Sequence, residues 1–162
     1  MARPKLPREF AEPGERLLTW GTGAAGQVLA SNRAIYLPSA GDFAAAGWTR
    51  LAWTSVDRAA WEEPEIVIEG RLEGSARRWR VMLSDAGRLP EVIRERVTAS
   101  IVISEHVDLV EGGGARIVGR RTDGDSAVEW SVTFDPGLDP DDPVLRAAAV
   151  TALADLRDSL GI

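Results

Sequence analysis

The sequence predicts a mainly β domain of the α+β class: bent antiparallel sheets or a partly open barrel, with one inserted helix and a C-terminal capping helix. Three observations lead to this prediction. Segments such as 77–83 and 128–134 alternate apolar and polar side chains, a period of two that is typical of antiparallel strands with one solvated face. The stretch 142–160 has the spacing of an amphipathic helix instead. Strands and helices do not alternate regularly, which disfavours a doubly wound parallel sheet.

Composition limits the chemistry that this chain can support. Its 162 residues are enough for one domain, since domains usually have roughly 100–200 residues. It has no cysteine and a single histidine, His106, which excludes disulfides, thiolate metal sites, cysteine nucleophiles and multi-histidine metal centres. We expect no cofactor. The net charge of −6 disfavours nucleic acid and anionic membranes as partners, because their phosphates attract basic proteins.

The sequence shows no targeting or membrane signal. The N-terminal residues contain no apolar run of the kind found in a signal peptide, and no segment approaches the ~20 apolar residues of a spanning helix. We therefore expect a soluble, cytoplasmic protein. Lys5 is the only lysine among 19 basic residues, a bias typical of GC-rich bacterial genomes.

Proline and alternation divide the first half of the chain. Residues 1–13 contain three prolines among charged residues and predict a flexible N-terminal arm, so we expect a single domain at residues 14–162. Asn32 and Arg33 suit the tight turn of a hairpin, and the long segment 48–61 is expected to bend in its middle. We expect strands at residues 16–20, 27–31, 34–37, 48–61, 65–69, 77–83 and 128–134.

Two helices are expected. The first runs from Leu89 to about Ile101, with Pro90 in its first turn, where a missing N–H is tolerated. The second has Asp141 or Asp142 as its N-cap, Pro143 at its first position and Gly161 at its end. Carboxylates at 139–142 are explained by this capping and by the helix dipole. The apolar face of the second helix, which includes Leu153 and Leu156, is expected to seal the core.

Three segments carry a resemblance to a known family: Gly14 to Trp20, Val28 to Leu37 and Leu51 to Val56. They resemble motifs of bacterial pleckstrin-homology-like (PH-like) or GRAM-like domains, namely a Gly-Glu pair, an Asn-Arg hairpin before an apolar strand, and a tryptophan-containing strand soon after. The segment 134–160 resembles that of small actinobacterial proteins of this length. The resemblance implies a PH-like fold. It carries no catalytic residues, and such folds host many unrelated roles. The first hairpin loop has no basic residue, in contrast to phosphoinositide-binding PH domains.

The segment Gly21-Thr-Gly-Ala-Ala-Gly26 matches the G-x-G-x-x-G pattern. Nucleotide binding through this pattern needs a helix that opens at the last glycines and directs its N–H groups at a pyrophosphate. Here Ile35 to Leu37 follows too soon for such a helix and its connection. We therefore favour a hairpin loop.

The single histidine supports an enzymatic alternative. A catalytic His106 needs an orienting carboxylate, for which Glu105, Asp108 or a distant aspartate are candidates, and a nucleophile or substrate proton. No serine nucleophile motif is visible. A strand-surface or loop histidine is the preferred interpretation, and a small histidine/carboxylate hydrolase or isomerase stays open.

Exposed arginines and tryptophans are the best candidates for an interaction surface. The arginines form a basic stripe if their strands are neighbours; otherwise they belong to a solvated face balanced by Glu62, Glu65, Glu69 and Glu73. The tryptophans near strand ends can line an apolar groove. The candidate residues are Arg77, Arg78, Arg80, Arg116, Arg120, Arg121, Trp20, Trp48 and Trp61.

These observations favour a non-catalytic binding or protein-interaction module with an unidentified protein partner. One alternative is the histidine enzyme, and another is peripheral membrane or acidic-partner binding through the arginine stripe. A homodimer is also open, because the edges of such sheets can pair between subunits.

Overall fold

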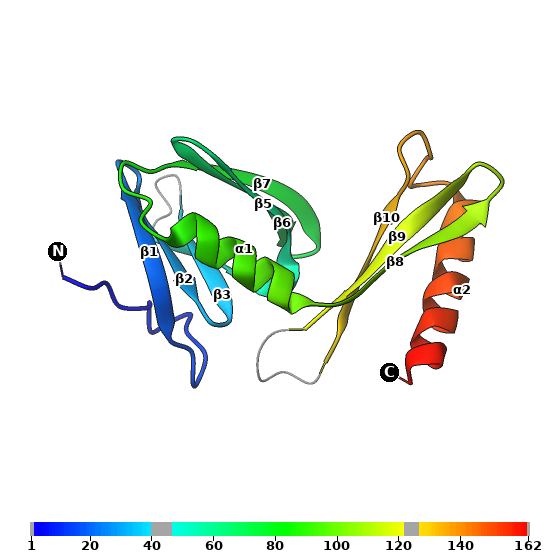
Figure 1. Cartoon of the computed structure of the whole chain (residues 1–162), viewed down its shortest axis with the longest axis horizontal. Coiled ribbons are helices and arrows are strands. Elements are labelled where there is room, and N and C mark those ends of the chain that lie inside the picture. Colours follow the sequence, from blue (N-terminus) through cyan, green and yellow to red (C-terminus); the bar gives the residue numbers. More distant parts are fainter. Residues whose placement is uncertain (1, 40–46, 122–126, 162) are drawn as a thin grey trace. The chain divides into compact units, whose positions relative to one another are not determined.

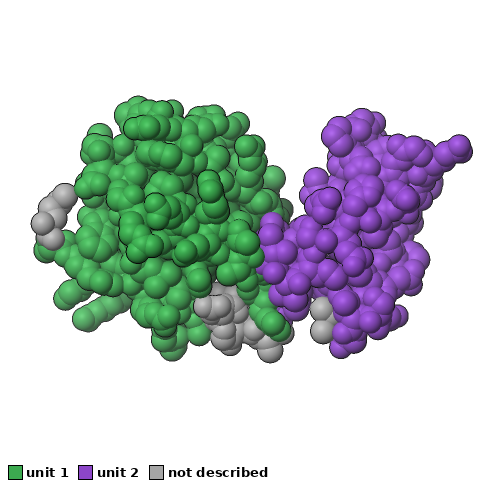
Figure 2. Space-filling view, in the orientation of Figure 1, with its two compact units in different colours: residues 1–100, 121–125 green, residues 101–120, 126–162 purple. Residues whose placement is uncertain are grey.

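The computed structural model describes residues 2–39, 47–121 and 127–161. It is mainly β, with three antiparallel sheets and two α-helices, the second of them C-terminal, and no closed barrel in the described part (Figure 1). This confirms the predicted class. The contacts divide the chain into two compact units, residues 1–100 with 121–125 and residues 101–120 with 126–162 (Figure 2). The single-domain boundary at 14–162 stays a prediction.

The first unit contains two sheets, each built from strands in sequence order, and one covering helix. The four-stranded sheet consists of β1 (Leu17–Gly23), β2 (Gly26–Ser31), β3 (Ala34–Pro38) and β4 (Trp48–Ala52). After the short helix η1 (Trp53–Ser55), the three-stranded sheet consists of β5 (Val56–Glu62), β6 (Glu65–Leu72) and β7 (Ser75–Met82). Helix α1 (Leu89–Ser100) follows. The expected bend in segment 48–61 is η1.

The main core of this unit lies on one face of the four-stranded sheet. Val28 and Ile35 point into it, together with Trp53 from η1. Helix α1 contacts β1, β2, η1 and β5, and it buries Leu89 and Ile93 in the same core. The helix that covers these sheets is therefore α1, whereas the sequence predicts this role for the terminal helix.

The opposite face of the same sheet is also covered. Leu29 and Tyr36 are fully buried there, and Leu6 and Phe10 of residues 2–13 pack against them. Strands β2 and β3 are consequently apolar on both faces although they are antiparallel. The expectation of one solvated face holds for β7, where Arg78 and Arg80 are exposed, and not for β2 and β3. The flexibility of the arm stays a prediction.

Close packing explains the glycine pattern at residues 21–26. The segment forms the β1–β2 hairpin, in which Gly23 pairs with Gly26, as the sequence predicts. The backbone N–H of Thr22 donates to the carbonyl of Asp85 at 2.7 Å. A Cβ on Gly23 would lie 2.0 Å from the carbonyl oxygen of Met82. The glycines therefore allow the hairpin to meet the end of β7.

The second unit is one antiparallel sheet with one helix. It contains β8 (Ile101–Val110), β9 (Gly113–Arg120), β10 (Glu129–Phe134) and α2 (Pro143–Leu160), with strand order β10-β9-β8. Helix α2 contacts β8 and buries Leu145 and Ala149. Its ends are those expected: Asp142 accepts from the N–H of Val144 at 2.9 Å, and Gly161 ends the helix in the left-handed conformation.

Two features of this unit differ from the sequence expectation. The sequence does not predict strands β8 and β9. In β8 most side chains are exposed, so this strand lacks a clean apolar alternation. Leu153 and Leu156 are only half-buried, so the seal of α2 lies one to two turns nearer its N-terminus. No helix in the described residues is both long and apolar enough to span a bilayer.

Candidate functional site

An open groove lies between β10 and α2 in the second unit. Its volume is about 680 Å³, within the roughly 300–1,000 Å³ typical of ligand sites. Sheet residues supply one wall and helix residues the other. The apolar lining consists of Val132, Phe134, Leu138, Pro140, Ala149, Val150 and Leu153.

The groove exists because α2 covers only part of the apolar face of its sheet. Val132 pairs with Ile117 and Phe134 with Ala115, so these side chains share one face. Ile117 and Ala115 in the central strand are fully buried, whereas Val132 and Phe134 in β10 are only half-buried. The uncovered part of the apolar face therefore lies over β10.

Charged groups lie at the border of this groove. Asp135, Asp141 and Arg146 are lining residues, and Asp141 and Arg146 make no side-chain hydrogen bond or ion pair in the described part of the chain. Asp135 is engaged: its carboxylate accepts from the backbone N–H of Gly114 at 2.9 Å. The groove thus combines an apolar interior with one free acidic and one free basic group.

The structure gives His106 an aspartate partner on the other, polar face of the sheet. Its Nε2 lies 2.9 and 3.0 Å from the two carboxylate oxygens of Asp135. This hydrogen bond, the backbone N–H of Gly114 and the charges of His106 and Arg116 hold the pKa of Asp135 below its ordinary value. The orienting carboxylate is thus the distant aspartate and neither of the two neighbours in sequence.

Only one member of the pair, Asp135, is a lining residue of the groove. His106 is exposed and is not one of the residues that line the groove. Ser104, on the same face, accepts a hydrogen bond from Arg116 at 3.1 Å. The described residues contain no group of three or more His, Asp or Glu that would hold a metal ion.

The six candidate arginines divide between separate sheets. Arg77, Arg78 and Arg80 lie in β7, whose hydrogen-bonded neighbour is β6, whereas Arg116 and Arg120 lie in β9, between β8 and β10. A continuous stripe requires that the two strands be neighbours in one sheet, and β7 and β9 are not. Arg120 is buried, and Arg121 is exposed beyond the end of β9.

Two of the arginines of β7 are balanced by glutamates of β5 and β6. Arg78 lies 3.6 Å from Glu69, and Arg80 lies 3.1 Å from Glu62 and 4.0 Å from Glu65. This arrangement is the solvated, charge-balanced face that was the alternative to a basic stripe.

The candidate tryptophans are half-buried parts of the core of the first unit. Trp20 and Trp48 pack in the cluster around Tyr36, which Trp48 meets edge to face at a centroid distance of 6.4 Å. Trp61 packs against the main core. The groove lining contains none of the three.

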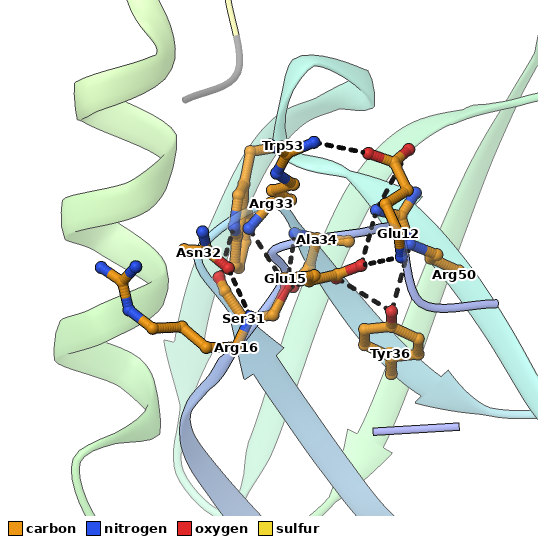
Figure 3. A network of polar contacts seen from close by, with 10 residues as sticks. All are labelled: Glu12, Glu15, Arg16, Ser31, Asn32, Arg33, Ala34, Tyr36, Arg50 and Trp53. Atoms are coloured by element: carbon orange, nitrogen blue, oxygen red, sulfur yellow. Dashed lines mark hydrogen bonds and ion pairs between the residues drawn. The ribbon is translucent and has the colours of Figure 1, made fainter. Parts of the chain in front are cut away.

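A buried polar network joins the N-terminal arm to the first sheet (Figure 3). The side chain of Glu15 is completely buried, and its carboxylate accepts from the hydroxyls of Ser31 and Tyr36 and from Arg50. Glu12 continues the network to Arg33 and Arg50. Since every carboxylate oxygen of Glu15 is bonded, the network holds the fold together and leaves no group for a ligand.

The sequence does not predict this groove, although one residue could have indicated it. That residue is Val150, an apolar residue outside the predicted apolar face of the helix. It is 69% exposed and lines the groove, whereas Val144, which is equally exposed, does not. Comparison with protein-family models, curated proteins and solved structures gives no match.

Proposed function

We propose that this protein is a non-catalytic protein-interaction module, and that its groove between β10 and α2 holds an apolar segment of a partner protein. The observation that carries the proposal is the partly covered apolar face over Val132 and Phe134. Burial of apolar surface is the dominant favourable contribution to most protein–protein association. The small number of polar groups at its border provides orientation, as in other ligand grooves.

We also propose that the first unit is the PH-like part of the protein. Its four-stranded sheet, its three-stranded sheet and the helix packed on them support this proposal, because the resemblance implies antiparallel sheets capped by a helix. Folds of this kind serve as binding scaffolds in many unrelated proteins. In this reading, the first unit is the scaffold and the second unit presents the groove.

The histidine enzyme ranks second. The hydrogen bond between His106 and Asp135 favours it, because an oriented imidazole can act as a general base. A hydrolase also needs a nucleophile within reach of that base, and the hydroxyl of Ser104 is bonded to Arg116 instead. The open position of the pair on the sheet favours a structural hydrogen bond.

Two valines of α2 offer a matched test of the proposal. Val150 and Val144 are both 69% exposed, and only Val150 lines the groove. A random peptide library is selected against the wild-type protein, and the enriched peptides are titrated against Val150→Glu and Val144→Glu. We expect Val150→Glu to weaken peptide binding at least about tenfold and Val144→Glu to leave it unchanged. Neither surface substitution should alter the free energy of unfolding by more than about 0.5 kcal/mol, so a difference between the two variants reports on binding and not on folding.

The proposal is wrong if no peptide is enriched, or if the two variants bind every enriched peptide equally. Hydrolysis of an ester, phosphoester or glycoside substrate that is lost in His106→Ala would establish the enzymatic alternative instead.

A further inference from the structure

We infer that the partner segment binds as an extended strand, which pairs with the free edge of β10 and places a basic side chain beside Asp141. This inference rests on the proposed function and specifies the occupant of the groove. Three independent features of the second unit support it: the course of the groove, the direction of the β10 backbone and the charges at the border.

The groove follows the edge of β10. Four consecutive residues, Val132 to Asp135, line it. Successive side chains of a strand point to opposite faces, so a groove that lay only over one face would be lined by alternate residues. Contact with all four places the groove along the strand edge, where the backbone of each residue is accessible.

That edge has backbone groups available for pairing. Strand β10 is the first strand in the sheet order, and β9 is its only neighbour in the described residues. The N–H of Asp135 donates to the carbonyl of Gly114 in the strand region of β9, at 3.0 Å. Since N–H directions alternate along a strand, the N–H groups of Phe134, Val132 and Trp130 point away from β9, toward an added strand.

The apolar walls set the side-chain pattern of the added strand. Alternate residues of an extended peptide point to the same side, so every second residue enters the space between Val132, Phe134 and Val150. Strand addition of this kind draws affinity from main-chain hydrogen bonds and specificity from pockets for alternate side chains. β10 has 6 residues, so we expect the binding segment of the partner to have about the same length.

The charges favour a basic residue at one end of this peptide. Three carboxylates lie close together at the loop end of the groove. Those of Asp139 and Asp142 accept backbone N–H groups at 2.9 Å each, whereas that of Asp141 is unbonded in the described residues. Arg146 lies on the helix wall and disfavours a basic side chain there. Asp141 is thus the group that an arginine or lysine of the peptide would pair with.

Backbone methylation of a selected peptide tests the strand. Each backbone nitrogen of a peptide that depends on Val150 is methylated in turn, which removes one donor and leaves the side chains in place. Because only alternate N–H groups of the peptide face β10, we expect losses of about tenfold or more at alternate positions and little change between them. Equal effects at all positions, or losses over a continuous helical stretch, would overturn the strand while leaving the groove as the binding site.

Asp141 is tested separately. We expect Asp141→Asn to weaken a peptide with arginine or lysine at the matching position about two- to fivefold, as for a partly exposed ion pair. The same peptide with alanine there should bind both proteins equally. Asp155→Asn, an exposed carboxylate of α2 outside the groove lining, is the control. Equal weakening of both peptides would contradict the ion pair.

The same experiments separate the inference from the proposed function. If no peptide depends on Val150, the proposed function fails and the inference fails with it. If Val150-dependent peptides bind without alternation on methylation, only the inference fails. Self-association of the protein in sedimentation measurements that Val150→Glu abolishes would assign the groove to a second copy of this chain and would also overturn the inference.

Discussion

The hydroxyl of Tyr36 donates a hydrogen bond of 2.9 Å to the completely buried carboxylate of Glu15, 21 residues earlier in the chain. The guanidinium of Arg50 reaches both groups, at 3.1 Å from the carboxylate and 3.2 Å from the hydroxyl. Residues from the arm junction, β3 and β4 are thereby joined at one point. This relationship gives the Gly14-Glu15 pair, which contributes to the PH-like resemblance, a structural reason.

We predict that Glu15→Gln destabilises the protein by about 3 kcal/mol, because removing one member of a buried pair leaves the other uncompensated. The matched control is Glu12→Gln, since Glu12 also pairs with Arg50 but is exposed. Exposed ion pairs contribute about 0–1 kcal/mol. Urea unfolding of both variants measures the difference, and equal free energies of unfolding for the two would contradict the assigned role of Glu15.

The pKa of Glu15 predicts a loss of stability in acid. Burial raises this pKa, but the hydrogen bonds from Ser31, the Glu12 backbone and Tyr36, together with the charge of Arg50, outweigh burial and hold it below the ordinary value of 4.5. A depressed folded-state pKa means that the stabilisation is present above pH 4.5 and is lost as the pH falls through the lower folded value. Unfolding measured at a series of acidic pH values should show a weaker pH dependence for Glu15→Gln than for wild type.

The single tyrosine gives a direct optical readout of the same network. Burial raises the pKa of Tyr36 from 10.0 to about 12; the hydrogen bond from Arg50 opposes this shift and the carboxylate of Glu15 adds to it. Stability from this raised pKa is complete below pH 10 and is lost as the pH rises toward 12. Tyrosinate absorbance should therefore change near pH 12 in the native protein and at a lower pH in Glu15→Gln. A wild-type midpoint near 10 would show that the hydroxyl is not buried in the network.

The stability lost when a leucine of α2 is replaced by alanine should depend on how deeply that leucine is buried. Leu145 is only 5% exposed, so Leu145→Ala should cost about 2–5 kcal/mol. Leu156 is half-buried, and Leu156→Ala should cost less than half as much. Thermal unfolding of the two variants compares them, and a larger loss for Leu156 would restore the sequence expectation that the C-terminal half of the helix seals the core.

The N-terminal arm has its own test. Phe10 packs in the cluster with Trp20 and Trp48, so Phe10→Ala should lower the free energy of unfolding by about 1–3 kcal/mol through loss of buried apolar area. A change below about 0.5 kcal/mol, typical of surface sites, would mean that residues 1–13 are the flexible arm that their prolines predict.

Local signals in the sequence were sufficient for most elements. The Asn32-Arg33 turn, the bend before Val56, and the capping residues Asp142 and Gly161 each act through their own backbone preferences, which do not depend on distant residues. Seven predicted segments, which cover eight of the ten strands in the described residues, and both helices follow from such signals. β8 and β9 do not. Most side chains of β8 are exposed, whereas β9 is buried on both faces and contains three glycines, so neither strand shows a clean alternation of apolar and polar residues.

Only the tertiary structure determines which side chains lie together on each surface. Which carboxylate meets His106, which arginines are balanced by glutamates, and where an apolar face is left uncovered all depend on pairing between residues far apart in the chain. Asp135 reaches His106 only because β9 brings β8 and β10 into one sheet. Composition and periodicity determine which segments fold as strands and helices. The packing of those segments determines which side chains contact one another and which stay exposed.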